Sequence, residues 1–371
     1  MCAIFKCPRN KEMKILHIIN SLSTGGAEKL VADLAPLQRD CGNDVEVLLF
    51  RGGESVFRGS LENSKIRVYD FGAGTSVYSP LNVLRLIPFM RKYDVIHVHL
   101  FPAQYWVAIA KVLTLSKVRL VTTEHSTYNR RRDISFFRYF DKWVYRRFTK
   151  IVGISPMTTD SLECYLNVQG RVQTISNGAD INKIHEAEAT CRESVATAEC
   201  RLMIMQVAGF RDAKDQDCVI RSLKSLPAGI EVVFVGDGVR RDACEKLADE
   251  LGVRERTHFL GIRSDVPALL KAADIVVMSS HWEGFGLAAV EGMAAGKPVI
   301  ASDVPGLAEV VGGAGILFPQ GDEKALAETI RKLSTDKEFY KRTAEACLRR
   351  ARDFDIRKTA AAYLALYAAE E

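Results

Sequence analysis

Two glutamates, Glu283 and Glu291, are the acidic residues whose surroundings point most clearly to a ligand site. The run Ile275–Met278 before them is apolar and rich in β-branched residues, which is typical of a buried parallel strand. A loop with two glycines follows, and Leu287–Ala295 then has the pattern of a helix. The pattern predicts Glu283 at the carboxyl end of a strand and Glu291 about one turn into the next helix, where open α/β sheets bind ligands. The alternative is a solvated loop acid and an acid that only complements a helix N-terminus.

A second group of chemically useful residues is the segment Gly209–Gln216, which contains Arg211 and Lys214. It follows the apolar run Leu202–Val207 and opens a helix, so its side chains are expected over the same sheet edge as Glu283. A planar guanidinium suits phosphate oxygens, and preorganised cations stabilise a developing negative charge without solvent reorganisation. The alternative is a solvated Arg and Lys at a helix start.

Two further elements are expected in the first half of the chain. Gly25 and Gly26 follow the first predicted strand and open the first helix, where free N–H groups favour an anion. This pair is not a GxGxxG fingerprint, so NAD binding is not predicted; a plain turn before a helix is the alternative. His125 ends another strand, where a structural histidine is the competing interpretation.

These segments together resemble the retaining nucleotide-sugar glycosyltransferases of glycosyltransferase family 4. The resemblance implies that Glu283 contacts the transferred sugar and that Glu291 binds the ribose hydroxyls. It also implies that Arg211 and Lys214 hold the diphosphate and that His125 hydrogen-bonds the sugar. Here the arginine lies one place later than in the common Gly-Arg element of the family. The remaining donor-binding positions implied by the resemblance are Gly25, Gly26, Gly209, Gly284, Phe285, Gly286 and Leu287.

Strand and helix patterns alternate along the chain, which predicts an α/β fold with parallel sheets. The family resemblance implies the GT-B arrangement, in which two Rossmann-like domains face each other across a cleft. A turn-like cluster at Asn177–Asp180 and a polar stretch after it place the boundary between residues 1–180, on the acceptor side, and residues 181–354, which bind the nucleotide sugar. By resemblance, the terminal helix within 355–371 packs back on the first domain. The predicted strands are Lys14–Ile19, Asp44–Phe50, Lys65–Phe71, Asp94–His99, Arg119–Thr123, Lys150–Ile154, Val172–Ile175, Leu202–Val207, Glu231–Val235, Thr257–Leu260, Asp274–Met278, Pro298–Ala301 and Gly315–Phe318.

Metal binding is weighed at two places and predicted at neither. Asp215 and Asp217 match an Asp-x-Asp pattern, but they open a helix, where Asp is favoured as a cap and first-turn residue. His97 and His99 alternate on one strand and share a face, and the sequence shows no third ligand for them; His99 at the strand end is a candidate acceptor contact. We expect neither a metal nor a cofactor other than the donor substrate.

Length and composition are those of a globular protein with room for two cores. The chain has 371 residues, of which 47% are apolar and 26% charged. No apolar run approaches the ~18 residues that a spanning helix needs, and the first residues have no signal-peptide pattern. Met13 is an alternative start to Met1. The 9 scattered cysteines predict reduced thiols and a cytoplasmic protein.

The charge is unevenly distributed. Residues 1–175 hold 25 Lys/Arg and 15 Asp/Glu, which gives a charge of +10. Residues 176–371 hold 26 Lys/Arg and 31 Asp/Glu, which gives −5, and the two halves sum to the net charge of +5. Basic residues alternate with aromatic side chains in the Arg130–Lys150 segment. This pattern predicts either contact with an anionic membrane surface or an ordinary amphipathic helix. Nucleic-acid binding is not expected, since no recognition motif is present and the second half is acidic. The basic residues concerned are Arg130, Arg131, Arg132, Arg138, Lys142, Arg146, Arg147 and Lys150.

The sequence thus predicts a cytoplasmic retaining glycosyltransferase, peripheral at the inner face of the membrane. It would move a sugar from a nucleoside diphosphate, UDP being favoured, to a glycan acceptor, expected to be lipid-linked, in cell-surface polysaccharide synthesis. A nucleotide-sugar epimerase or a phosphorylase is the first alternative, and it would turn over without a glycan acceptor or need phosphate or a lysine-bound cofactor. A non-catalytic sugar-nucleotide-binding subunit is the second, and it would bind donor without transfer or hydrolysis.

Overall fold

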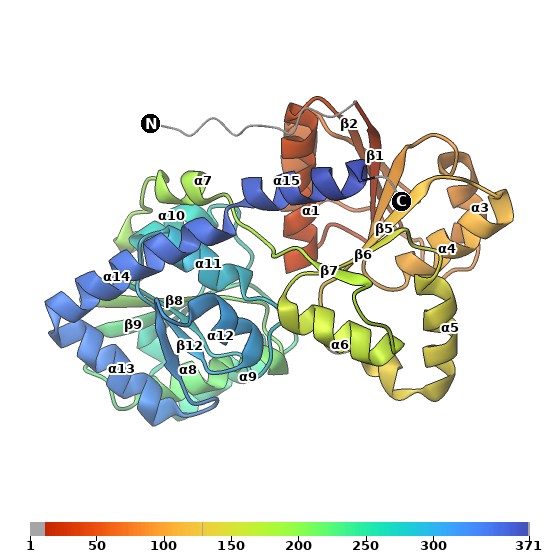
Figure 1. Ribbon diagram of the computed structural model, residues 1–371. Helices are drawn as coiled ribbons and strands as arrows, with labels where there is room; N and C mark the ends of the chain where they lie inside the picture. Colours follow the sequence, from red (N-terminus) through yellow and green to blue (C-terminus); the bar gives the residue numbers. More distant parts are fainter. Residues whose placement is uncertain (1–11, 128, 370–371) are drawn as a thin grey trace. The chain divides into compact units, whose positions relative to one another are not determined.

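The computed structural model describes residues 12–127 and 129–369, and the chain divides into two compact units. Unit 1 comprises Met1–Gly178 and Ile356–Glu371, and unit 2 comprises Ala179–Asp355. Each unit alternates strands and helices along the chain (Figure 1). Within the part of the chain that is described, no helix combines the length and the apolar character needed to cross a bilayer.

Unit 1 is built on a parallel sheet that has seven strands within the described residues, in the order β3-β2-β1-β4-β5-β6-β7. Both faces are covered by helices, which is why strands such as Lys14–Ile19 are apolar almost throughout. The strands are β1 (Lys14–Ile19), β2 (Asp44–Leu49), β3 (Arg67–Asp70), β4 (Val95–His99), β5 (Arg119–Glu124), β6 (Lys150–Gly153) and β7 (Val172–Thr174).

The two faces of this sheet carry separate cores. Leu16 and Ile18 pack toward α3, α4, α5 and α6, whereas Ile15 and Ile19 pack toward α1, α2 and α15, as the period of two along a strand requires. The last helix, α15, lies beside α1 (Figure 1). The helices are α1 (Gly26–Asp40), α2 (Val56–Asn63), α3 (Asn82–Leu86), α4 (Ala103–Thr114), α5 (Ser135–Tyr145), α6 (Pro156–Leu166) and α15 (Ile356–Ala368).

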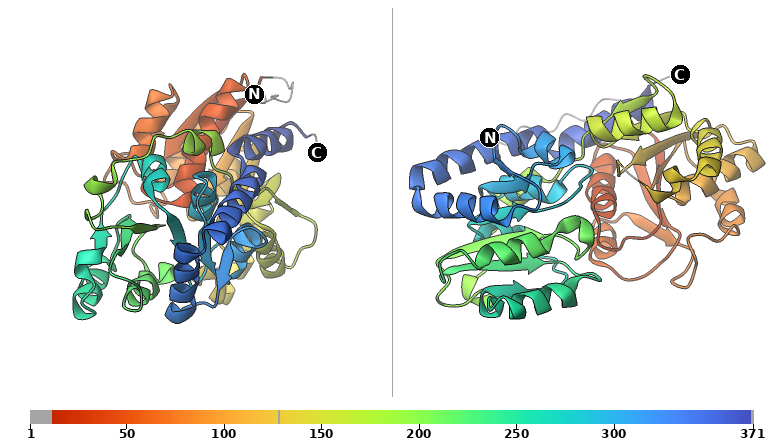
Figure 2. Two further views of the ribbon diagram at one scale, coloured as in Figure 1. Left: turned by 90° about the vertical axis from the view of Figure 1, so that its left-hand side faces the viewer. Right: turned by 90° about the horizontal axis from the view of Figure 1, so that it is seen from below.

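Unit 2 has a parallel sheet with six strands in the described residues, in the order β10-β9-β8-β11-β12-β13. The helices α8, α9 and α13 cover one face over a core that includes Ile204, Phe234 and Ile330. Helices α13 and α14, drawn in blue, pack against each other (Figure 2). The strands are β8 (Leu202–Val207), β9 (Ile230–Val235), β10 (Thr257–Phe259), β11 (Ile275–Met278), β12 (Val299–Ser302) and β13 (Ile316–Phe318), and the helices are α7 (Ile181–His185), α8 (Gln216–Leu223), α9 (Arg241–Glu250), α10 (Val266–Ala272), α11 (Leu287–Ala294), α12 (Pro305–Val311), α13 (Glu323–Thr335) and α14 (Lys337–Ala351).

The thiols depart from the sequence prediction at one position. The described cysteines include six free thiols, of which Cys218, Cys244 and Cys347 are buried. Cys41, at the end of α1, is disulfide-bonded. The prediction that the thiols are reduced throughout is therefore wrong at Cys41, because sequence spacing does not show which cysteines the fold brings together.

Candidate active site

The two charged segments of unit 2 follow neighbouring strands. Gly209, Arg211 and Lys214 come after β8, and Glu283 comes after β11, which pairs directly with β8. From β8 the strand order runs outward in both directions, to β9 and β10 on one side and to β11, β12 and β13 on the other. The gap between β8 and β11 is therefore the topological switch point of the sheet, and open α/β sheets bind ligands at the carboxyl ends of the strands there.

An ion pair joins the two segments. The ammonium group of Lys214 contacts Oε2 of Glu283, and both side chains are mostly buried, with 23% and 17% of their surface exposed. Ser280 Oγ donates to the same carboxylate oxygen at 3.4 Å. The structure thus brings together one cation and one carboxylate that the sequence placed 69 positions apart.

Two buried polar residues hold the Lys214 backbone in place, and sequence analysis missed both. Ser279 Oγ donates to the carbonyl oxygens of Lys214 at 3.0 Å and of Asp215 at 2.7 Å. Gln206 Nε2 donates to the Lys214 carbonyl at 3.0 Å and to Ser279 Oγ at 3.1 Å. A polar residue near the end of an otherwise apolar strand, as Gln206 is in β8, is the pattern that could have revealed them.

Packing of a neighbouring helix shapes the loop that carries Glu283. A Cβ atom on Gly306, at the start of α12, would lie 2.2 Å from the carbonyl oxygen of Glu283, so only glycine allows the two backbones to come this close. Gly286 has φ of 90° and caps α11, and a Cβ there would lie 2.6 Å from Leu307 Cδ2. Close packing against the start of α12 therefore holds the loop that carries Glu283.

The remaining predicted residues of unit 2 fall into buried and exposed groups. Glu291 is buried in α11 with 6% of its surface exposed, and it lies in the second turn of the helix, as predicted. Phe285 is buried and packs edge-on against Phe354, whereas Gly284 and Leu287 are half-buried. Arg211 is exposed, which leaves its guanidinium accessible to solvent.

The acids of the Asp-x-Asp pattern take part in interactions within unit 2. Asp215 caps α8 by accepting from the backbone N–H of Cys218 at 3.3 Å, as predicted for a helix start. Its other oxygen lies 3.6 Å from His281 Nε2. Asp217 accepts from Arg240 at 2.6 Å.

His125 lies on the wall of a cavity in unit 1. The cavity has a volume of about 530 Å³ and is lined by loops that follow three strands, with Asn20 after β1, Phe101 after β4 and His125 after β5. Burial lowers the pKa of His125 to about 3, so its imidazole is neutral at physiological pH. Its Nδ1 atom is buried and has no hydrogen-bond partner among the residues that the structure describes.

The glycine pair of unit 1 lies at the exposed N-terminus of α1. Helix α1 begins at Gly26, and Gly25 precedes it with extended backbone at φ of 178°. A Cβ on Gly25 would lie 2.2 Å from Oε2 of Glu28, because the Glu28 side chain reaches back over the start of the helix. An acidic group in the first turn complements the helix dipole, so an incoming anion would have to displace Glu28.

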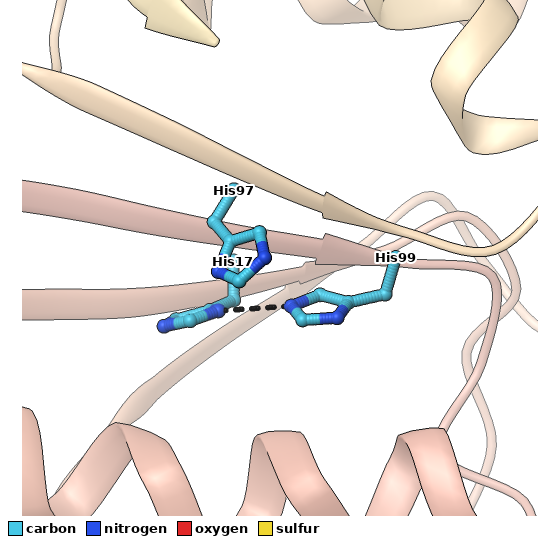
Figure 3. A group of neighbouring side chains, drawn as sticks. All are labelled: His17, His97 and His99. Atoms are coloured by element: carbon cyan, nitrogen blue, oxygen red, sulfur yellow. Dashed lines mark hydrogen bonds between the residues drawn. The ribbon is translucent and has the colours of Figure 1, made fainter. Parts of the chain in front are cut away.

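Three buried histidines form a group that the sequence analysis recognised only in part. His17 on β1 lies directly opposite His97 on β4 and adds to the predicted His97 and His99 pair. One nitrogen from each lies within 4.8 Å of the others (Figure 3). All ring nitrogens of the three already have hydrogen-bond partners, including Gln38, Thr123 and Tyr367. The three imidazoles therefore form a hydrogen-bonded group inside unit 1.

Two cations of the basic segment, Arg131 and Arg132, are paired inside unit 1. Arg131 is buried, pairs with Asp141 at 3.3 Å and lies over the Phe101 ring at 4.4 Å. Arg132 has 7% of its side chain exposed and pairs with Glu124 at 3.2 Å. Both charges are paired within unit 1, so they are unavailable to a membrane surface. The side chain of Arg130 lies outside the described residues.

Comparisons with known proteins cover nearly the whole chain. A model described as glycosyltransferase family 4 matches residues 24–183, and a model described as glycosyl transferases group 1 matches residues 188–350. The crystal structure of Anabaena HepE in complex with UDP and glucose superposes with a TM-score of 0.84 at 26% identity, covering 96% of this chain and 99% of that one.

Curated relatives agree with the family models. A lipopolysaccharide core biosynthesis glycosyltransferase of Rhizobium meliloti is 27% identical over 87% of this chain and 89% of its own length. An uncharacterized glycosyltransferase of Methanocaldococcus jannaschii is 30% identical over 59% of this chain, and the match spans 60% of that relative. The predicted fold class and family are confirmed: the chain belongs to the glycosyltransferases of the GT-B fold, with a family 4 first half and a group 1 second half.

Proposed function

We propose that this protein is a retaining glycosyltransferase that moves one sugar from a nucleoside-diphosphate sugar to a lipid-linked glycan in cell-surface polysaccharide synthesis. The similarity to a structure containing UDP and glucose supports a UDP-sugar donor. The similarity to a lipopolysaccharide core enzyme supports a surface glycan as acceptor. A lipid-linked acceptor would be met at the cytoplasmic face of the membrane.

The observation that carries this proposal is the contact between Lys214 and Glu283 at the switch point of unit 2. The contact joins a cation to a carboxylate, and a nucleoside-diphosphate sugar presents a phosphate and a sugar, which suit those two groups, next to each other. Lys214 would contact the diphosphate of the donor, and Glu283 would accept hydrogen bonds from sugar hydroxyls.

The proposed chemistry needs charge stabilisation at the leaving group. As the bond to the anomeric carbon breaks, negative charge grows on the diphosphate, and Lys214 with the exposed Arg211 stabilises it. Glu291 would bind the ribose and His125 a substrate hydroxyl. The acceptor hydroxyl attacks from the face that the nucleotide leaves, so the configuration at the anomeric carbon is retained.

Alanine variants of the two glutamates test the site. Glu291→Ala should weaken donor binding by about 10- to 100-fold, since a hydrogen bond to a charged group contributes ~1.5–3 kcal/mol. Glu283→Ala should mainly lower kcat, because contacts to the reacting sugar strengthen in the transition state. Glu328→Ala, an exposed glutamate on α13, is the matched control and should change neither. Wild-type kinetics in both site variants would refute the assignment.

Donor and stereochemistry need separate experiments. Thermal shifts with UDP-, GDP- and ADP-sugars identify the base, because a bound ligand raises the unfolding temperature by mass action. The anomeric coupling constant of the product, measured by proton NMR against that of the donor, decides between retention and inversion. An inverted product would refute the retaining mechanism and leave the donor assignment intact.

A further inference from the structure

A series of hydrogen bonds connects the cavity histidine to helix α1. Gln38 Oε1 lies 2.7 Å from His17 Nε2, and His17 Nδ1 lies 3.2 Å from His99 Nε2. His99 Nδ1 lies 3.1 Å from His125 Nε2. Figure 3 shows the middle link, between His17 and His99. Gln38 is on α1, and the three imidazoles come from β1, β4 and the loop after β5.

The three imidazoles of this hydrogen-bonded series, His17, His99 and His125, are all neutral. Gln38, His17 and His99 are fully buried, and burial lowers the pKa of His17 to about 4 and that of His99 well below its usual value. A neutral imidazole carries one N–H and one bare nitrogen. Each ring that donates at one nitrogen must therefore accept at the other, so all links of the chain point in the same direction.

The amide of Gln38 sets that direction. Its Oε1 can only accept, so His17 carries its proton on Nε2 and accepts through Nδ1 from His99 Nε2–H. By the same rule His99 accepts through Nδ1 from His125 Nε2–H. His125 is left with a bare Nδ1, which is the buried atom without a hydrogen-bond partner among the described residues, on a side chain that lines the cavity.

A second chain of hydrogen bonds starts from the same amide. Gln38 Nε2 donates to Tyr367 Oη at 3.4 Å, and Tyr367 lies 2.5 Å from His97 Nδ1. Since the hydroxyl receives the amide proton, it donates its own to His97, whose Nε2–H then donates to Thr123 Oγ1 at 2.8 Å. Tyr367 belongs to α15, so the terminal helix helps to hold the Gln38 amide in place.

We propose that Gln38 is a positioning residue that acts through His17 and His99 to keep His125 in the Nε2–H tautomer, with Nδ1 bare to accept a hydrogen bond from a substrate hydroxyl. This inference rests on the proposed function for the identity of the hydroxyl, which would belong to a sugar. The tautomer itself follows from the hydrogen-bonded chain alone. A group that only accepts hydrogen bonds, such as a phosphate oxygen, would not be matched by this nitrogen.

The tautomer can be measured without any substrate. In protein labelled with ¹⁵N at its 7 histidines, a bare ring nitrogen resonates far downfield of a protonated one. His125→Gln assigns the His125 signals by their disappearance. We expect Nδ1 of His125 to give the downfield signal and Nε2 the upfield one. The opposite pattern in the wild-type protein would overturn the proposal without any variant having to fold.

Substitution of the glutamine tests its control over the histidine. Gln38→Met keeps the side-chain length and removes the acceptor, so both His125 nitrogens should move to intermediate positions as the tautomers mix. Gln38→Glu restores an acceptor facing His17 and should restore the wild-type pattern. Gln104→Met is the matched control, because Gln104 is equally buried in unit 1 but donates to Thr122, which takes no part in the series of hydrogen bonds that leads to His125. Unchanged His125 signals in Gln38→Met would overturn the proposal.

Kinetics and metal content complete the test. The kcat/KM for glycosyl transfer should fall in Gln38→Met, recover in Gln38→Glu and stay at the wild-type value in Gln104→Met. If transfer is absent in every protein while the NMR pattern holds, the proposed function fails and the tautomer assignment stands. Zinc bound at one ion per chain and lost in His17→Phe would overturn the assignment, since His17 and His99 would then be ligands.

Discussion

Acid should destabilise unit 1 steeply, because three of its histidines are fully buried and uncharged. His17, His97 and His99 are 0% exposed, and burial holds the pKa of each below the usual value near 6.5. Below pH 6.5 the unfolded chain takes up protons that the folded chain does not. Stability is therefore fully present above that pH and is lost as the pH falls toward 4.

The size of the effect follows from the pKa difference. At pH 5 the pKa of a histidine in the unfolded chain lies about 1.5 units above the ambient pH. Each histidine that stays neutral when folded therefore lowers the free energy of unfolding by about 2 kcal/mol. Three such residues cost about 6 kcal/mol, comparable with the 5–15 kcal/mol of a typical domain. These three residues should lower the free energy of unfolding by roughly 4 kcal/mol per pH unit below pH 6, and His125, whose pKa burial also lowers, adds to that slope.

Urea unfolding between pH 5 and pH 8 measures this slope. Tryptophan fluorescence in a Trp282→Phe background reports on unit 1, which contains the other two of the 3 tryptophans. His17→Phe should lower the slope of the free energy of unfolding against pH by the contribution of about one proton, whatever it does to the stability at pH 8. His185→Gln removes an exposed histidine and should leave the slope unchanged. A flat profile, or the same slope in both variants, would refute the reasoning.

Three shorter predictions follow from the remaining contacts. Gly306→Ala should lower the free energy of unfolding by about 1–3 kcal/mol and reduce transfer activity, because the new Cβ would collide with the Glu283 backbone. Gly59→Ala, where a Cβ meets open space, should have neither effect. Equal losses in the two variants, measured by thermal unfolding, would contradict this. Transfer should survive EDTA, since lysine and arginine supply the positive charge at the diphosphate, and a loss of activity restored by manganese would exclude that role. Neutralising the exposed Arg146 and Arg147 should weaken binding to anionic vesicles by about 1 kcal/mol for each charge, and the effect should shrink at high salt. Equal binding to neutral and anionic vesicles would argue against membrane attachment.

Local sequence patterns were sufficient to predict the strands and the positions that follow them. The ranges of β1 and β8 agree with the predicted Lys14–Ile19 and Leu202–Val207 because strands buried on both faces are mostly apolar and stand out from the polar segments around them. The same periodicity placed Glu283 after a strand and Glu291 within a helix. Strand end and loop are properties of neighbouring residues, so they can be predicted without a tertiary fold.

Which side chains meet was decided only by the tertiary structure. Gln38 and Tyr367 are 329 positions apart and meet because α15 packs beside α1. Arg131 and Arg132 turn inward because the fold brings buried carboxylates to them, whereas an amphipathic pattern shows only that cations are present. Hydrogen bonds and ion pairs form over about 3 Å, and sequence periodicity carries no information on distances between remote segments. The chain alone therefore determined the class of the protein and its candidate groups, and folding decided which of those groups pair and which remain available to a ligand.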